Sequence, residues 1–430
     1  MTTYATHTPE AATLTDRPSR SRLDLPNLVW ALAATHFVSR AGAAVQSFLV
    51  LYLTQEQGLT PTTAGAVVAA VGVGGIGSQL LGGWLGDRIG RRHTMLVGFL
   101  GTAVAIGALG SAGTLPAIWA AAVGVGLMSD LFRPAGAAVV ADLPPRQRIR
   151  AFGLLFWAAN LGFSVATVTG GILARHGYGL LFWINAMASV GAALIVWRRV
   201  PETRPAAPEQ PRRALLPVLL RDRLMITMTL IYATYFTLFL QTFATLPLVM
   251  TADGHGPATY GAMLALNGVG IVVGQPLAVR LLAGRDPSAV LAVSMLLVGA
   301  GIASSAIASS SAGYAASVLI WTLGQIGIAV MYGGTFADLA PADLRGRYMG
   351  VASATWSVGA VFGPLVGTVL LNHAGRGALG AVAAITGIAL FAGQRLLGPA
   401  LRCRTAANNE RRPSARCESP RSKRLAYAGS

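Results

Sequence analysis

Twelve stretches of predominantly apolar residues, divided by short polar segments, constrain this chain more than any other feature. They lie near residues 28–53, 62–85, 94–112, 116–140, 151–174, 179–197, 224–250, 257–283, 287–308, 313–337, 347–372 and 377–396. A helix needs about 20 apolar residues to cross a bilayer, whereas β-barrel spans are shorter and alternate in polarity. Only 11% of the residues are charged, against roughly 25% in soluble domains. The sequence therefore predicts an all-α integral membrane protein with twelve transmembrane helices in the lipid bilayer.

The net charge of +17 does not indicate nucleic-acid binding, because the basic residues lie in short gaps between apolar runs rather than on one face. The only cysteines, Cys403 and Cys417, both lie in the polar C-terminal tail, at a spacing that matches no zinc-binding pattern. We therefore expect no nucleic-acid partner, no bound metal and no structural disulfide. The polar first 27 residues lack the apolar segment of a signal peptide, so the first span is expected to serve as the insertion signal.

Arginine placement predicts the orientation of the chain in the membrane. One side holds Arg88, Arg91, Arg92, Arg146, Arg148, Arg150, the arginines of 198–223, Arg285, Arg345 and Arg347, and the other side holds Arg175 and Arg376. Because cytoplasmic loops carry an excess of Lys and Arg, the first set is predicted to be cytoplasmic. Both termini are then cytoplasmic, as an even number of spans requires. We expect a multi-pass protein of the cell membrane.

The longest internal polar segment divides the spans into two groups of six. This segment, residues 198–223, carries seven arginines and five prolines. We predict a cytoplasmic N-terminal tail (1–27), an N-terminal six-helix bundle (28–197), a cytoplasmic linker (198–223), a C-terminal six-helix bundle (224–397) and a basic, disordered C-terminal tail (398–430). Offsets of 195–197 pair residues of the two groups, including Gln46 with Gln241, Asp142 with Asp338 and Gly162 with Gly359. The groups are therefore predicted to be parallel repeats about an axis along the membrane normal.

A loop rich in glycine and arginine joins the second and third spans. It reads Gly83-Trp84-Leu85-Gly86-Asp87-Arg88-Ile89-Gly90-Arg91-Arg92. Together with the two groups of six spans, this loop resembles the signature of the major facilitator superfamily, G-x-x-x-D-R-x-G-R-R. The resemblance covers residues 25–395 and implies the major facilitator fold, with a gate at Asp87 and Arg88 that controls alternating access. The other gating-loop residues are Gly83, Gly90, Arg91 and Arg92. The alternative is a tight glycine turn whose arginines only set the topology.

The fifth and eleventh spans carry glycines at regular spacing. They are Gly153, Gly162, Gly170 and Gly171 in the fifth span, and Gly350, Gly359, Gly363 and Gly367 with Pro364 in the eleventh. The pattern resembles the glycine motif of the twelve-helix drug/proton antiporters in this superfamily, although Ala166-Thr167 replace the central Gly-Pro in the fifth span. The segments 130–135 and 241–248 resemble the bacterial multidrug-efflux-like branch. The resemblance implies an antiporter, and the alternative is small-residue packing between helices.

Ionisable residues inside the spans are few. His36 and Arg40 lie four apart in the first span, and Asp130 and Arg133 lie three apart in the fourth, so each pair shares a helix face. Counted from the predicted cytoplasmic helix ends, Arg40 lies about 18 Å deep and Asp130 about 15 Å deep. The resemblance implies that the first, fourth, seventh and tenth spans line the solute cavity. We therefore predict an Arg40–Asp130 pair across the wall of that cavity.

Two roles for these charged side chains remain open. A charge in a span costs about 2.5–3.5 kcal/mol on insertion scales, so ionisable groups there are functional candidates. In the first role, Asp130 exchanges a proton during transport, with His36 as a relay. In the second role, Asp130 and the arginines form a structural ion pair, and Arg40 alone faces the solute.

Aromatic and amide side chains of the seventh and tenth spans are candidates for the substrate cavity. They are Tyr232, Tyr235 and Gln241 in the seventh span, and Trp321, Gln325 and Tyr332 in the tenth. Aromatic rings with a polar tip can hold an amphipathic solute. The alternative for each aromatic residue is a place in the interfacial belt, where Trp and Tyr also gather.

No nucleotide-binding or catalytic motif accompanies these features. The sequence has no glycine-rich loop ending in Lys-Ser or Lys-Thr, and Lys423 is its only lysine. No Ser-His-Asp or metal-binding constellation can be assembled, so we expect a transporter without a cofactor rather than an enzyme. The leading hypothesis is a monomeric, proton-coupled exporter of small amphipathic compounds that works by alternating access. The alternatives are uptake or facilitated movement of a polar or anionic solute bound by Arg40 and Arg133, and a transporter-like membrane sensor without flux.

Overall fold

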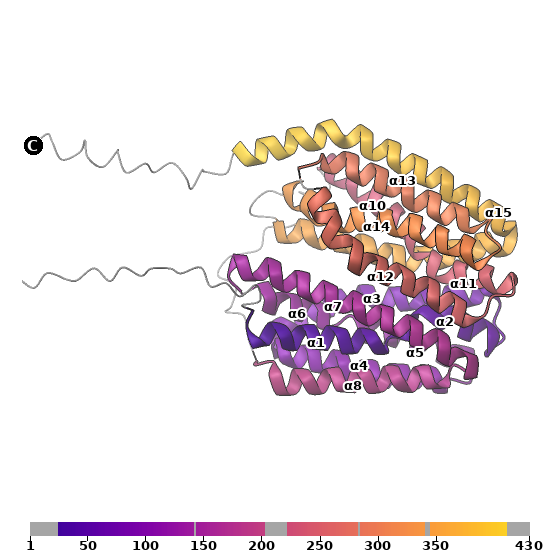
Figure 1. The fold of residues 1–430 in the computed structure, drawn as a ribbon. Helices are drawn as coiled ribbons and strands as arrows, with labels where there is room; N and C mark the ends of the chain where they lie inside the picture. Colours follow the sequence, from indigo (N-terminus) through magenta and orange to yellow (C-terminus); the bar gives the residue numbers. More distant parts are fainter. Residues whose placement is uncertain (1–24, 142, 203–221, 283, 340–344, 411–430) are drawn as a thin grey trace, which may run out of the picture.

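Helices make up nearly all of the described chain. The computed structural model describes residues 25–141, 143–202, 222–282, 284–339 and 345–410. The first half contains α1 (Asn27–Gly42), α2 (Ala44–Gln55), α3 (Pro61–Ile89), α4 (Arg91–Ser111), α5 (Leu115–Ser129), α6 (Phe132–Ala141), α7 (Pro145–Leu173), η1 (Ala174–His176) and α8 (Gly179–Arg199). The second half contains α10 (Arg223–Leu240), α11 (Thr242–Ala252), α12 (Pro257–Leu281), α13 (Pro287–Ser305), α14 (Ser311–Leu339) and α15 (Arg345–Glu410). The described residues contain no strand (Figure 1).

Eleven of the described segments are long and apolar enough to cross a membrane. The last of them, Val351–Thr405, has 55 residues and contains two predicted spans. Within it Gly375 takes a φ of 78°, a left-handed conformation that glycine adopts without a steric penalty, and the helix is interrupted there. Division at Gly375 yields the twelve helices that the sequence predicts, and the all-α membrane fold is confirmed.

Three spans that the sequence predicts as single helices, the first, fourth and seventh, are each broken in two. The breaks lie at Ala43 between α1 and α2, at Asp130 between α5 and α6, and at Gln241 between α10 and α11. Pro134 explains the second break. It has no N–H to donate to the carbonyl of Asp130, four residues earlier, and its ring would clash with that carbonyl in a helix. Asp130 therefore lies at a helix end, with a φ of −108° and a ψ of 0°.

The helices form two bundles, one of α1–α8 and one of α10–α15, that meet along two seams (Figure 1). At one seam α3 packs against α15, where a side chain on Gly65 would collide with Thr368, and one on Gly72 with the backbone of Ala360. At the other seam α7 packs against α12. The two seams join equivalent pairs of spans, the second with the eleventh and the fifth with the eighth. Small residues at such positions let helix backbones approach closely.

The bundles are closed at one end of the molecule and part toward the other. We call the latter the terminal end, because the start of α1 and the end of α15 both lie there (Figure 1). One face of α3 carries Gly65, Gly72, Gly83 and Gly86. The first two are packed against α15, whereas Gly83, nearer the terminal end, is exposed and faces open space. Contact between α3 and α15 is therefore confined to the half of the seam away from the termini.

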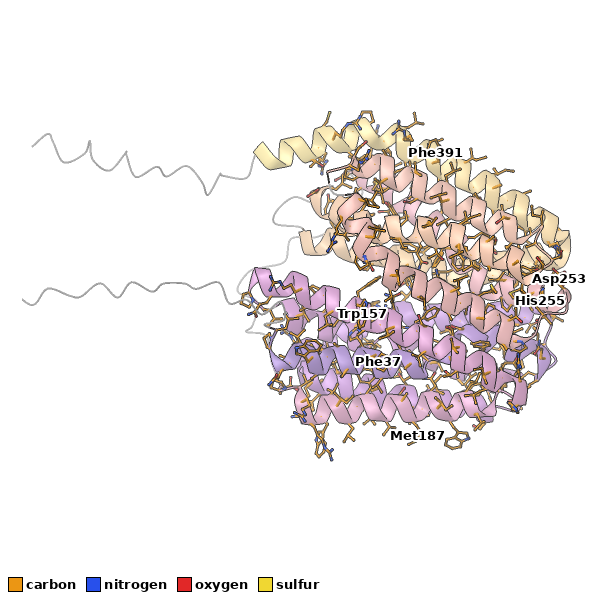
Figure 2. All side chains as sticks on the ribbon, viewed as in Figure 1. Phe37, Trp157, Met187, Asp253, His255 and Phe391 are labelled. Carbon is orange, nitrogen blue, oxygen red and sulfur yellow. The ribbon has the colours of Figure 1, made fainter. Side chains whose placement is uncertain are left out.

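The seam between α7 and α12 follows the same pattern. Toward the closed end, Gly171 lies against Gly261, and a side chain on Gly268 would collide with Ser164. Toward the terminal end, Gly153 on the same face of α7 meets open space. Trp157, also on this face, is 45% exposed and lies at the boundary between the two bundles (Figure 2). Both seams are thus packed at the closed end and open at the terminal end.

The C-terminal part of α15 ties together the terminal ends of the second bundle. Asp222, which caps α10, accepts hydrogen bonds from Arg404 at 2.7 Å and from the hydroxyl of Tyr348 at 2.8 Å. Asp286, which caps α13, accepts one from Arg402 at 3.0 Å. The predicted disordered tail is therefore wrong over residues 398–410, which continue the helix. Residues 411–430 and the linker residues 203–221 lie outside the described chain.

An arginine-centred network holds the closed end of the second bundle. Arg376 donates to the carboxylate of Asp253 at 2.7 Å and to the backbone carbonyls of Ala306 and Ala308 at 2.8 Å. The hydroxyl of Tyr314 donates to the other oxygen of Asp253 at 2.7 Å. This hydrogen bond, followed by Arg376, holds the pKa of Asp253 below its ordinary value. Asp253 lies at the end of the molecule opposite the termini (Figure 2).

Candidate functional site

Three charged side chains meet at the break in the fourth span. The Nε atom of Arg133 lies 2.7 Å from Oδ1 of Asp130, and Nη2 of Arg40 lies 3.8 Å from the same oxygen. The contact between Arg133 and Asp130 follows from their spacing, since residues three apart share a helix face. Arg40 comes from α1, so this contact joins the first and fourth spans. The structure thus brings together the Arg40–Asp130 pair that depth counting predicts.

These charged side chains are neither sealed off nor fully exposed. The relative exposure is 24% for Arg40, 28% for Asp130 and 39% for Arg133. The carboxylate is therefore held by a close ion pair with Arg133 and a longer one with Arg40, while solutes or water can still reach the cluster. The ring of His36 packs edge-on against Phe132, with centroids 5.2 Å apart. A relay from His36 to Asp130 stays a prediction.

An aromatic cluster occupies the equivalent place in the second bundle. Its members are Tyr232, Tyr235, Phe236 and Phe239 of α10, Trp321, Tyr332 and Phe336 of α14, and Trp356 of α15. Ring centroids lie 4.7 Å apart for Tyr232 and Tyr332, and 5.2 Å apart for Phe236 and Trp356. The sequence-based candidates Tyr232, Tyr235 and Trp321 are buried in this cluster, and Tyr332 is half-buried. Neighbouring rings cover Tyr232 and Trp321 in this conformation. A contact of these residues with a solute stays a prediction.

The two amide candidates serve the packing of the helices. Gln241 is 5% exposed at the break between α10 and α11, and its side-chain oxygen accepts a hydrogen bond from Thr245 at 3.1 Å. Gln325 is half-buried, and its oxygen accepts a hydrogen bond from Asn267 at 2.8 Å. Gln325 thus belongs to a polar contact between α12 and α14. A role of either residue in binding the solute stays a prediction.

Trp356 is a candidate that the sequence reading missed. Its side chain is 41% exposed although it packs against Phe236 and Phe239. The sequence feature that could have indicated Trp356 is its position three residues before Gly359, on the face of α15 that carries the glycine motif. Only the packing of α10 against α15 places it in the aromatic cluster.

The glycine motif brings the fifth span against the first and the eleventh against the seventh. Gly162 of α7 lies against Phe37 and Arg40 of α1, and Gly359 of α15 lies against Phe236 of α10. Further along, Gly170 meets α2, and Gly363 and Gly367 meet Gln241. Gly153 faces open space, Gly171 lies at a seam, Pro364 lies inside α15, and Gly350 is described only as part of that helix. These contacts agree with small-residue packing between helices, and a role of the motif in coupling stays a prediction.

The gating loop is a turn at a single glycine. α3 ends at Ile89, Gly90 takes a φ of 94°, and α4 begins at Arg91. The guanidinium of Arg88 lies 4.8 Å from the ring centroid of Trp84, a cation–π contact. Gly83 faces open space, and Arg91 is 8% exposed. Asp87 lies in α3, and its side chain is outside the described residues.

Glu202 caps the helix that follows this turn, a contact that the sequence reading missed. Its carboxylate accepts hydrogen bonds from the backbone N–H groups of Arg92 and His93, both at 3.3 Å. The guanidinium of Arg92 donates to the carbonyl of Trp197, close to the end of α8. The gating loop is thus attached to the start of the linker, about 110 positions away in sequence, which no local pattern indicates.

Replacing Glu202 with alanine is expected to lower stability by about 1 kcal/mol, because two N–H groups at the start of α4 lose their acceptor and the helix dipole loses an anion. The measurement is the thermal unfolding midpoint of the purified protein in detergent. Glu202→Gln keeps an acceptor and is expected to lose only part of this stability. An unchanged midpoint in Glu202→Ala would mean that water satisfies the two N–H groups equally well.

Comparison with known proteins places the chain in a family. A family profile described as Major Facilitator Superfamily matches residues 32–352 and 242–425. The chain is 25% identical to the multidrug resistance protein MdtH of Shigella dysenteriae over 359 residues, which cover 80% of this chain and 82% of that protein. It is 26% identical to the tetracenomycin C resistance and export protein of Streptomyces glaucescens over 434 residues, covering 85% and 78% of the two chains.

A solved structure shares the fold. The crystal structure of a POT family transporter in complex with a thioalcohol-conjugated peptide superimposes with a TM-score of 0.76 at 15% sequence identity. The match covers 88% of this chain and 99% of that transporter. Two six-helix bundles, joined at two equivalent seams, agree with both comparisons. The chain belongs to the major facilitator superfamily and is a membrane transporter.

Proposed function

We propose that this protein exports small amphipathic compounds in exchange for protons, and that Asp130 takes up and releases the proton. The observation that carries the proposal is the contact of Asp130 with Arg40 and Arg133 at a helix break inside the membrane. These three residues are the charged ones within the predicted spans, apart from residues at the span ends. An ionisable group at such a position is costly, and transporters use such groups for ion coupling. The multidrug resistance and export proteins among its relatives support the direction of transport.

Protonation of Asp130 changes the forces between the first and fourth spans. The deprotonated carboxylate attracts Arg40 and Arg133, whereas the neutral acid keeps only hydrogen bonds to them. A solute that hydrogen-bonds to the deprotonated carboxylate competes with the proton for the same oxygens. Exchange follows when only one of the two is bound while the bundles move relative to each other. In this proposal the seams close at the terminal end in the outward-facing state, and Asp87 and Arg88 hold that end shut.

A second candidate function is the uptake of an anionic solute. Two arginines surround a single carboxylate, so an anion can replace Asp130 as their partner while Asp130 takes a proton. Proton and solute then move in the same direction. Proteoliposomes with an internal pH dye distinguish the two functions. Exchange moves protons against the solute, uptake moves protons with the solute, and solute movement without a dye response would contradict proton coupling altogether.

Labelling of the native cysteines is expected to show that the terminal end faces the cytoplasm. Cys403 is exposed on the last turns of α15, and Cys417 is the only other cysteine of the chain. A membrane-impermeant maleimide should leave the protein in intact cells unlabelled and should label it in inside-out membrane vesicles. The control is Cys403→Ser/Cys417→Ser, which should stay unlabelled in both preparations. Labelling in intact cells would reverse the proposed orientation and, with it, the assignment of the open end to the cytoplasm.

A further inference from the structure

Trp356 faces the space between the two bundles. On α15, Trp356 lies on the same face as Gly359, Ala360 and Gly363, because these residues recur at helical spacing. Gly359 and Gly363 pack against α10, and Ala360 packs against Gly72 of α3. One turn closer to the terminal end, Gly75 of α3 meets open space. The indole of Trp356 therefore projects where the seam between α3 and α15 opens, which explains an exposure of 41% beside buried aromatic neighbours.

The neighbouring side of α3 supports this placement. Ile76, one turn from Gly72 toward the terminal end, is 40% exposed, and Gly75 meets open space. Because α3 and α15 run antiparallel at the seam, Ile76 and Trp356 lie at the same level. Two apolar side chains thus border an opening into the space between the bundles.

The internal repeat places the charged cluster and the aromatic cluster at the same depth. Gly162 packs against Arg40 in the first bundle, and its counterpart Gly359 packs against Phe236 in the second. Arg40 and Phe236 therefore occupy similar positions in the two bundles, each against a glycine of the motif. Phe236 packs against Trp356, with ring centroids 5.2 Å apart. A solute between the bundles meets charged groups on one side and an aromatic surface on the other.

The charges of this site do not suit a cationic solute. With Asp130 deprotonated, Arg40 and Arg133 leave one net positive charge, and with Asp130 protonated they leave two. The sequence of the second-bundle spans contains no charged residue between Leu224 and Met250 or between Val351 and Asn372, the two segments next to Trp356. A cation would be repelled at every stage of the cycle, since charges interact strongly at low dielectric.

We infer that the site selects planar aromatic solutes without a net charge, with their rings against Trp356 and their hydrogen-bonding groups toward Asp130 and the two arginines. This inference rests on the proposed function, because proton exchange requires a solute that competes with the proton for Asp130. An anionic solute would instead compete with Asp130 for the arginines and would carry the proton along. An uncharged aromatic solute stacks on the indole and hydrogen-bonds to the carboxylate.

The test uses three tricyclic probes that differ in charge: uncharged acridone, the cation N-methylacridinium and the anion anthracene-9-carboxylate. Proteoliposomes of the full chain with an internal pH dye yield the probe concentration for half-maximal proton flux. Acridone is expected to act at a concentration at least about 10-fold lower than N-methylacridinium, given one unpaired positive charge in the site. An equal or lower concentration for either charged probe would overturn the inference.

The aromatic contact is tested with Trp356→Ala. This variant should raise the half-maximal concentration of acridone about 3- to 10-fold, and Trp356→Phe should restore most of the affinity. Trp183→Ala is the matched control, because Trp183 is 71% exposed on α8, which packs against α1 and α4 of the first bundle. An unchanged half-maximal concentration of acridone in Trp356→Ala would show that the indole does not contribute to the site.

A second readout separates this inference from the proposed function. Acridone binding to the purified chain in detergent should raise the thermal unfolding midpoint, as any ligand of the folded state does. Trp356→Ala should reduce this shift at a given acridone concentration. A shift that depends on Trp356, without proton flux in proteoliposomes, would support the solute class and contradict proton exchange. Proton flux driven equally well by N-methylacridinium would support exchange and contradict the solute class.

Discussion

Replacing Asp130 with asparagine is expected to reduce solute-driven proton flux by about 100-fold or more, since the amide cannot take up a proton. Asparagine has nearly the shape of the acid, and its carbonyl oxygen can take the place of the carboxylate oxygen that lies 2.7 Å from Nε of Arg133. Solute binding should therefore persist. The measurement is the internal pH dye response of proteoliposomes, normalised to the amount of inserted protein.

A second assay separates coupling from folding in this variant. Exchange of labelled for unlabelled solute across the membrane requires the bundles to move but requires no net proton transfer. Asp130→Asn is expected to keep this exchange. Asp253→Asn is the matched control, because Asp253 is also paired with an arginine, at 2.7 Å, but lies outside the spans. It should keep proton flux.

Full proton flux in Asp130→Asn would contradict the proposed coupling role. Asp130 would then belong to a structural ion pair, with Arg40 alone facing the solute. Loss of both proton flux and exchange would instead indicate that the ion pair is needed for the movement itself. Breaking a buried pair costs about 3–5 kcal/mol, although the exposure of 24–39% in this cluster reduces that cost.

The second large effect is expected at the seam between α3 and α15. A side chain on Gly72 would lie 2.7 Å from the backbone of Ala360, which cannot move aside without displacing the helix. Gly72→Val should therefore disfavour the closed seam by about 1–3 kcal/mol, the usual cost of overpacking. Such a difference shifts an equilibrium about 5- to 150-fold. Transport should fall by a comparable factor, because the cycle requires this seam to close.

The control for this variant is Gly75→Val. Gly75 lies three residues away on the same helix and faces open space, so both substitutions change helix propensity equally and only one collides with α15. Seam opening can be followed by the labelling rate of Thr368→Cys in a chain whose two native cysteines are replaced by serine. Gly72→Val should accelerate labelling from the closed end, and Gly75→Val should not. Equal rates would show that the seam tolerates the valine.

The sequence predicts the fold because the bilayer leaves few options. Apolar runs of about 20 residues must be helices in lipid, and glycine marks the helix turn within 345–410. The charged pair within the fourth span was also predictable, since Asp130 and Arg133 are neighbours on one helix face. Depth counting places Arg40 near them because helical rise is constant.

Other features depend on contacts between residues far apart in sequence. Glu202 reaches the amides of Arg92 and His93 only because α8 ends beside the start of α4. The buried state of Tyr232 follows from the rings of Tyr332 and Phe336, which α14 contributes. A residue type and a spacing do not indicate which of several neighbouring helices an aromatic side chain meets.

The sequence by itself thus determined the number of spans, their division into two repeats and the presence of three charges inside the membrane. Each of these depends on local composition or on helical periodicity, which chain order preserves. The tertiary structure decided which seams are packed, which end is open, and that Trp356 packs on Phe236 while its side chain stays 41% exposed. Those properties depend on which helices pack against one another. Small residues such as Gly72 and Gly359 permit close packing, but the sequence does not show which helix packs against them.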